Sequence, residues 1–145
     1  MKKYELDLST EIEHLGIKLF RIKALVSFGS VSAGELGGYV ESEKNLSQVS
    51  GDAWVYGNAR VYGNARVYGN AQVSGNAQVK VLKDILVIGF LGDNRYITVT
   101  KSNGKIAAGC FLGTVKEFEE KVKEKYGKDG DYNIFLPAIK KWLKS

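Results

Sequence analysis

A run of six-residue repeats in the middle of the chain restricts its fold more than any other feature. From Gly51 to Lys80 the sequence consists of five consecutive hexads, two of which are Gly-Asn-Ala-Arg-Val-Tyr. Residues 45–50 follow the same spacing as a sixth, degenerate hexad. Valine recurs at every sixth position, and a small residue precedes each valine by two positions. The recurring valines are Val49, Val55, Val61, Val67, Val73 and Val79.

This period indicates short strands joined by corners. An alanine and a valine two positions apart lie on one face of an extended segment. The Gly-Asn or Gly-Asp pair predicts a turn, because glycine adopts left-handed backbone conformations and Asn or Asp tolerates them. A repeated strand and corner predicts a three-faced solenoid of about 18 residues per turn, with valine inside. Arg60 should then lie near Gln78, and Tyr56 near Ser74.

The repeats resemble the hexapeptide-repeat, left-handed parallel β-helix superfamily. The likeness is close over residues 45–80 and looser over 31–44. Acyltransferases, γ-carbonic anhydrases and many phage or prophage proteins of unknown role share this repeat. The nearly invariant hexads, the entry segment Leu36–Glu41 and the later segment Gly109–Thr114 look most like the phage and prophage group. The resemblance implies a homotrimer, and it is far more specific for fold than for function.

We therefore predict a mainly β protein: a short left-handed parallel β-helix with N-terminal strands and a small C-terminal β-β-β-α-α module. The expected domains are residues 1–30 for the N-terminal strands or cap, 31–81 for the β-helix and 82–145 for the α+β module. Strands at Lys2–Leu8 and Ile17–Leu25 are expected to form a hairpin that caps the first turn of the solenoid.

Strand and turn signals define the C-terminal module. Strands are expected at Asp84–Phe90, Arg95–Lys101 and Lys105–Phe111. Turns are expected at Gly92-Asp93-Asn94 and Asn103-Gly104, because these residues favour tight connections.

Two helices should follow these strands. Thr114-Val115-Lys116-Glu117 has the pattern of a capping box and should begin the first helix, which Gly127 should end. The second helix is expected to begin either at Asp131 or near Pro137, since proline disturbs a helix interior.

Composition favours a cytoplasmic protein. The chain of 145 residues has a single cysteine, shows no signal-peptide pattern and contains no apolar run close to the roughly 20 residues of a membrane span. The net charge of +5 is concentrated in residues 82–145, which hold twelve Lys or Arg against eight Asp or Glu. This field favours anionic partners, although lysine-rich amphipathic helices often simply face solvent.

Catalytic groups are scarce in the sequence. The β-helix acyltransferases use a histidine base and the γ-carbonic anhydrases use a histidine cluster, but His14 is the only histidine here and lies outside the hexads. We interpret His14 as an ordinary surface or turn residue and Cys110 as a buried structural thiol. We therefore expect no enzyme activity, no cofactor and no metal site.

The outward positions of the hexads form the candidate ligand site. Aromatic rings provide stacking faces, and arginine provides a fork of donors suited to phosphate or carboxylate. The same residue types are common in subunit interfaces, so a trimer contact or a solvated face explains them equally well. The predicted ligand-binding residues are Trp54, Tyr56, Arg60, Tyr62, Arg66 and Tyr68.

These features together predict a non-enzymatic, homotrimeric binding scaffold of phage or prophage type in the bacterial cytoplasm. Its expected ligand is a small phosphorylated molecule held between subunits, for example a nucleotide signal of host immunity. A degenerate acyltransferase and a purely structural assembly protein are the alternatives. Long nucleic acid is an improbable partner, because the repeats carry balanced charge.

Overall fold

The structure is a computed structural model that describes residues 2–49, 51–91, 95–108, 111–127 and 131–145. Its elements in chain order are β1 (Tyr4–His14), β2 (Ile17–Ala24), β3 (Leu36–Val40), the 3-10 helix η1 (Glu43–Asn45), β4 (Trp54–Val55), β5 (Arg60–Val61), β6 (Gln72–Val73), β7 (Gln78–Val79), the 3-10 helix η2 (Leu82–Asp84), β8 (Ile85–Leu91), β9 (Arg95–Thr100), β10 (Lys105–Ala108), β11 (Phe111–Thr114), α1 (Val115–Tyr126) and α2 (Asp131–Leu143).

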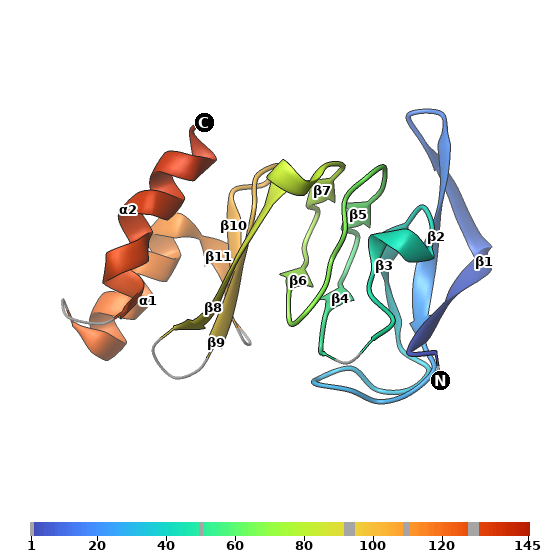
Figure 1. Cartoon of the computed structure of the whole chain (residues 1–145), viewed down its shortest axis with the longest axis horizontal. Coiled ribbons are helices and arrows are strands. Elements are labelled where there is room, and N and C mark those ends of the chain that lie inside the picture. Colours follow the sequence, from blue (N-terminus) through green and yellow to red (C-terminus); the bar gives the residue numbers. More distant parts are fainter. Residues whose placement is uncertain (1, 50, 92–94, 109–110, 128–130) are drawn as a thin grey trace.

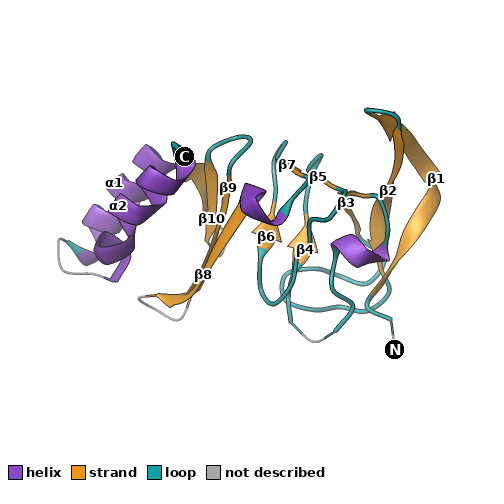
Figure 2. Ribbon diagram, turned by 45° about the horizontal axis from the view of Figure 1, so that its top comes forward, coloured by secondary structure: helices purple, strands orange, loops and turns teal. Residues whose placement is uncertain are grey.

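The elements follow one another along the long axis of the molecule. The β1–β2 hairpin lies at one end, the short strands β3–β7 occupy the middle, and the sheet β8–β11 separates them from helices α1 and α2 (Figure 1). Figure 2 shows the same order from a second direction. This arrangement gives two apolar cores. One lies within the middle strands and the hairpin, and the other lies between the C-terminal sheet and the helices.

The prediction of a left-handed parallel β-helix is wrong. The strands form mixed sheets: a five-stranded sheet of order β1-β2-β3-β5-β7, an antiparallel sheet of order β11-β10-β9-β8, and the pair β4-β6. Parallel pairing within the described residues is confined to a short stretch, and the sheets do not close into a parallel helix. Four of the five regular hexads give two residues each to a strand, and the hexad at residues 63–68 gives only the isolated bridge of Val67. The longer flanking strands pair as antiparallel hairpins and supply most of the pairing.

The interior pattern of the five hexads from residue 51 to residue 80 is confirmed. Their valines are fully buried, and the alanine two positions before each valine is at most 1% exposed. The turn glycines Gly57, Gly63, Gly69 and Gly75 have φ values between 60° and 69°, the left-handed region that the Gly-Asn pairs predict. The 18-residue register is also confirmed, because Trp54 pairs with Gln72 and Arg60 pairs with Gln78.

The degenerate hexad does not follow this register. Val49, predicted to point inward, is 70% exposed, and Leu46 is fully buried in its place. Leu46 forms a parallel bridge with Val67, which is 21 residues later rather than 18. The cause is the 3-10 helix η1, which shifts the entering chain. The buried Asn45 fixes this shift by donating from Nδ2 to the carbonyl oxygen of Ala65 at 2.8 Å.

The predicted N-terminal hairpin is present and continues the middle sheet. β1 and β2 pair antiparallel around a two-residue turn, in which Leu15 has φ 52° and Gly16 has φ 82°. β1 extends to His14, six residues beyond the predicted end of the strand. β2 then pairs with β3, where Gly37 is required by close approach: a Cβ atom there would lie 2.5 Å from the carbonyl oxygen of Val55.

The C-terminal module has the predicted order with one addition. The predicted third strand is shorter, and β11 pairs with it as a further antiparallel strand. The predicted third strand ran through Phe111, and no fourth strand was predicted. Cys110 and the predicted turn Gly92-Asp93-Asn94 lie outside the described residues.

Both predicted helices form. The Thr114 hydroxyl accepts from the backbone N–H of Glu117, and Gly127 ends α1 by donating to the carbonyl oxygen of Lys123. α2 begins at Asp131 and contains Pro137 in its interior, so the alternative start near the proline is wrong. α1 packs on the sheet through Phe118 and Val122, which belong to the second apolar core.

Side chains of the C-terminal module bond to the backbone of the last short strands. The Thr98 hydroxyl accepts from the N–H of Gln72 at 2.9 Å, and the Ser102 hydroxyl accepts from the N–H of Gln78 at 2.7 Å. The Asp84 carboxylate accepts from the N–H of Lys80 at 2.9 Å. These N–H groups lie where a further parallel strand would otherwise pair. The module therefore caps the open edge of the repeats.

Candidate ligand-binding site

The six predicted ligand-binding residues occupy different environments, although their hexads are similar in sequence. Trp54 is fully buried, contrary to the prediction of an outward ring. Its ring packs edge-on against Phe28 at 5.2 Å and against Tyr4 at 6.1 Å between centroids. The segment before β3 covers this position, so Trp54 belongs to the core and offers no surface to a ligand.

The β1–β2 hairpin covers two further predicted residues. Nη1 of Arg60 lies 2.7 Å from Nδ1 of His14, and the His14 and Tyr62 rings meet edge-on at 5.1 Å. Tyr62 is 6% exposed. Arg60 and Tyr62 therefore attach the hairpin to the repeats through His14, and Arg60 is half-buried.

Tyr56 lies in a cavity at the junction between the repeats and the C-terminal sheet. The cavity has a volume of about 380 Å³ and is lined by Tyr56, Gln72 and Ser74 from the repeats and by Phe111 and Leu112 from β11. The Tyr56 hydroxyl is 3.3 Å from the Ser30 hydroxyl. The predicted proximity of Tyr56 and Ser74 is confirmed, but the ring is half-buried and already in contact with its own chain.

Arg66 and Tyr68 remain open to solvent. Tyr68 is 64% exposed, and Arg66 is also exposed. Both flank the buried Val67, so their side chains leave the strand on the same outward face. No residue that the structure describes forms a hydrogen bond or an ion pair with the Arg66 guanidinium. Of the six predicted residues, this pair retains the chemistry expected of a ligand site.

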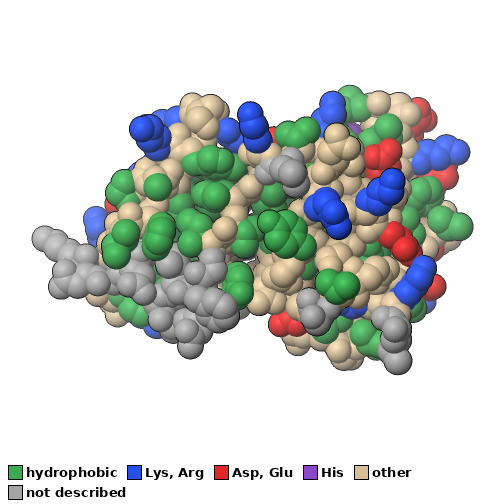
Figure 3. All heavy atoms as spheres, in the orientation of Figure 1, with side chains coloured by type: hydrophobic (Ala, Val, Ile, Leu, Met, Phe, Trp, Pro, Cys, Tyr) green, Lys and Arg blue, Asp and Glu red, His purple; other side chains and the backbone are tan. Residues whose placement is uncertain are grey.

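A groove of about 280 Å³ separates Arg66 and Tyr68 from strand β8. We call it the Arg66 groove. Its other wall is apolar and consists of Ala71 with Ile85, Leu86 and Val87. On the face shown in Figure 3, hydrophobic side chains gather over the C-terminal part of the molecule, whereas Lys and Arg side chains are scattered over the whole face.

The change of register at β8 explains why this groove exists. One 18-residue step after Val67 lies Ile85, where a further parallel strand of the repeat would begin. Ile85 instead starts β8 and pairs antiparallel with β9, opposite Thr100. The chain thus leaves the parallel register beside Arg66 and Tyr68, so no later hexad covers them.

His14, the candidate base, presents no accessible reactive group. Nδ1 of His14 faces Arg60, and Nε2 is buried without a hydrogen-bond partner in the described part of the chain. His14 is therefore neither a plain surface residue nor an exposed base. Cys110 lies outside the described residues. Among the residues that are described, no cluster of His, Cys, Asp or Glu is arranged to hold a metal ion.

The sequence interpretation missed a cavity in the C-terminal module, between α1 and the β10–β11 hairpin. Four aromatic residues surround it: Phe111, Phe118, Tyr126 and Tyr132. These residues come from β11, α1 and α2, so no single sequence pattern predicts that they meet. The described helices do not include one long and apolar enough to cross a membrane.

Comparison with known proteins gives a local result. No curated protein matches the chain. Residues 59–75, which include Arg66 and Tyr68, match the family described as YdcK Beta solenoid repeat. The match covers the hexads alone, and it supports a β-solenoid repeat family for this segment.

Proposed function

We propose that this protein is a non-enzymatic binding scaffold that holds a small phosphorylated ligand in the Arg66 groove. The proposal rests on two exposed groups on one side of an apolar groove. One is the Arg66 guanidinium, which has no partner among the described residues, and the other is the Tyr68 ring. The related hexad provides a contrast, because Arg60 and Tyr62 have the same spacing and are covered by His14.

The chemistry of the groove suits a nucleotide-like anion. A guanidinium fork binds phosphate oxygens through two parallel hydrogen bonds, and this contact strengthens when water is excluded. The Tyr68 ring offers a stacking face to a base. Ile85 and Val87 form an apolar wall opposite these groups, which supports binding of a ring rather than of a fully hydrated ion.

The size of the groove supports a site shared between subunits. Its volume of about 280 Å³ is below the roughly 300–1,000 Å³ typical of small-molecule sites. A homotrimer, as the hexapeptide-repeat resemblance implies, would add a wall from a neighbouring copy. In this proposal the ligand and the subunit contact occupy the same face, so the two interpretations of the Tyr and Arg positions are compatible.

The state of His14 favours binding over acyl transfer. A general base must reach the reacting proton within hydrogen-bond distance. One ring nitrogen of His14 faces a permanent cation, and the other is buried. The phage and prophage resemblance supports one biological form of the proposal, in which a cytoplasmic phage protein sequesters a nucleotide signal of host immunity.

The test compares two arginines from identical hexads by calorimetric titration against a panel of cyclic and ADP-ribose-type nucleotides. Arg66→Ala should weaken binding about tenfold to a hundredfold, because a charge-assisted hydrogen bond contributes roughly 1.5–3 kcal/mol. Arg60→Ala should lower the melting temperature and leave the affinity nearly unchanged. Tyr68→Phe should bind like the wild type, whereas Tyr68→Ala should bind more weakly.

Native mass spectrometry of the protein purified from cells would report the number of subunits and any retained ligand together. A trimer with added mass in the nucleotide range is the expected result. Binding that depends on Arg60 and not on Arg66 contradicts the assignment of the site. A wild-type protein that binds no member of the panel contradicts the nucleotide proposal.

A further inference from the structure

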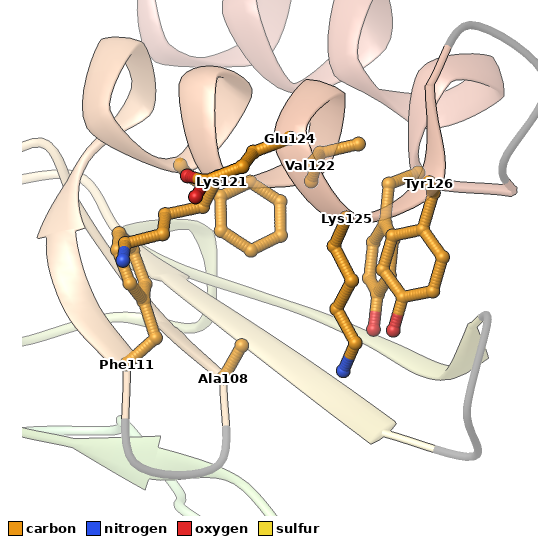
Figure 4. Close-up of a pocket in the computed structure, with 9 residues that line it drawn as sticks. Ala108, Phe111, Lys121, Val122, Glu124, Lys125 and Tyr126 are labelled. Atoms are coloured by element: carbon orange, nitrogen blue, oxygen red, sulfur yellow. The ribbon is translucent and has the colours of Figure 1, made fainter.

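The C-terminal module contains a second cavity. It shares no lining residue with the Arg66 groove, and other elements form it. It has a volume of about 420 Å³, within the range of roughly 300–1,000 Å³ that small-molecule sites occupy. α1 forms one side, and the β10–β11 hairpin and α2 contribute the rest (Figure 4). We call it the α1 cavity.

Aromatic rings form a continuous series along the α1 cavity. Phe111 packs on Phe118, Phe118 on Tyr132, and Tyr132 on Tyr126, with 5.4 Å between centroids at each step. The first and last contacts are tilted and the middle one is edge-on. Ala108 contributes a small side chain to the wall. All four rings line the cavity, and flat apolar molecules pack well against aromatic walls.

Lysines accompany these rings. Lys121 and Lys125 lie one helical turn apart on α1, and both line the cavity with Glu124. Figure 4 shows Lys121 extending toward Phe111 and Lys125 extending beside Tyr126. Within the described residues, the Lys121 ammonium has no hydrogen bond or ion pair. Among the described lining residues, two lysines and one glutamate accompany the apolar walls.

The opposite side of α1 shows a different arrangement of charge. There Glu119 forms ion pairs with Lys123, at 3.7 Å, and with Lys140 of α2. The contact with Lys140 joins the two helices. Both contacts hold the pKa of Glu119 below its ordinary value, chiefly through the hydrogen bond from Lys140. Lys123 and Lys140 on that side share Glu119 as a partner, whereas Lys121 lines the cavity without a partner among the described residues.

We propose that the α1 cavity binds a flat aromatic molecule that carries one negative charge, such as an aromatic carboxylate or sulfonate. The rings supply the apolar contact, and the ammonium of Lys121 pairs with the anionic group. Glu124 opposes the negative charge of such a ligand. This site lies on other residues than the Arg66 groove, so it stands or falls independently of the proposed function.

The test uses a fluorescent probe of this chemistry, 1-anilinonaphthalene-8-sulfonate, with its uncharged parent N-phenyl-1-naphthylamine as the matched ligand. Folded wild-type protein should bind one sulfonate probe per chain with enhanced fluorescence, and 2-naphthoate should displace it. Lys121→Gln should weaken binding about tenfold, the loss expected for one charge-assisted contact. Lys123→Gln makes the same chemical change on the opposite side of α1 and should have no effect.

Two further variants test the sign of the charge on the ligand and the location of the site. Glu124→Gln should tighten binding of the sulfonate about twofold to threefold, because it removes a like charge. Arg66→Ala should change nothing, with folding of every variant verified by near-ultraviolet circular dichroism. The proposal is overturned if the neutral parent binds as tightly as the sulfonate, if Lys121→Gln has no effect, or if Arg66→Ala abolishes binding. Weaker binding by Glu124→Gln would identify a cation site and equally exclude the anion.

Discussion

Nη1 of Arg60 lies 2.7 Å from Nδ1 of His14, a residue 46 positions earlier in the chain. The guanidinium is always protonated, so in this contact Arg60 donates and His14 accepts. The bond joins the tip of the β1–β2 hairpin to the second strand of the repeats. It also explains why Arg60, which was predicted to bind the ligand, instead contacts the hairpin.

This contact should be measurable as a coupling energy. His14→Ala and Arg60→Ala should each destabilise the protein, and the double variant should be destabilised by less than the sum of the two. We expect a coupling of about 1 kcal/mol, since a hydrogen bond to a charged group at a partly exposed site contributes no more than roughly 1.5–3 kcal/mol. Guanidinium chloride unfolding provides the four free energies. Strict additivity would show that the two side chains do not interact in solution.

A charge should have very different effects on stability at two valines that occupy equivalent hexad positions. Val61 is fully buried and Val49 is 70% exposed. Val61→Asp should prevent folding, because an unpaired buried carboxylate costs several kcal/mol. Val49→Asp should change the free energy of unfolding by less than about 0.5 kcal/mol, as surface substitutions usually do. Circular dichroism and thermal melting distinguish the two. A stably folded Val61→Asp protein would contradict the inward assignment.

The hydroxyl of Thr98 should contribute to stability as a cap. Thr98 is 2% exposed, and its hydroxyl accepts from the N–H of Gln72. Thr98→Val preserves the shape and leaves that N–H unsatisfied, which should cost about 1–3 kcal/mol. Thr98→Ser keeps the hydroxyl and should lose much less. Amide hydrogen exchange at Gln72 should accelerate in the valine variant alone. Equal exchange in both variants would mean that this hydrogen bond does not protect the strand edge.

The capping box of α1 makes part of the stability pH-dependent. The N–H and the hydroxyl of Thr114 hold the pKa of Glu117 below its ordinary value of 4.5. A depressed carboxyl pKa stabilises the folded state above the unfolded pKa, and this contribution disappears as the pH falls through the folded value. Wild type should therefore exceed Glu117→Gln in stability at pH 7, and the difference should vanish well below pH 4.5.

Loss of the Thr114 cap gives an independent measure of the same feature. Thr114→Ala should cost about 0.5–2 kcal/mol, the usual effect of removing a helix N-cap, whereas Thr114→Ser should be nearly neutral. Urea unfolding at neutral pH gives these values. A difference between wild type and Glu117→Gln that persists unchanged at pH 3 would show that the carboxylate has another role.

The interior of the five regular hexads could be predicted because it depends on local spacing. Glycine turns and the Ala–Val interval determine which side chains point inward, and both are visible in the sequence. The prediction for the sixth hexad failed because this hexad lacks the glycine. There η1 replaces the corner with a different path, which puts Leu46 opposite Val67. The prediction of the fold class failed because pairing between separate segments, such as β2 with β3, has no local signature in the sequence.

The candidate site could be predicted only as a class of positions. Arg60 and Arg66 occupy identical hexads, so no local pattern distinguishes them. The difference arises because His14 covers one, while the chain leaves the repeat at β8 beside the other. Trp54 was mistaken for an outward ring for the same reason, since Phe28 and Tyr4 cover it from elsewhere in the sequence.

The contacts of Thr98, Ser102 and Asp84 with the last strand edge also limit how copies of this protein can associate. A bare parallel edge is a template on which another chain can add, copy after copy, into a filament. Here the groups that would recruit the next copy are already bonded to hydroxyl and carboxylate oxygens of the same chain. Stacking of a further copy on this edge would have to break these bonds first, so the edge is protected against end-to-end growth.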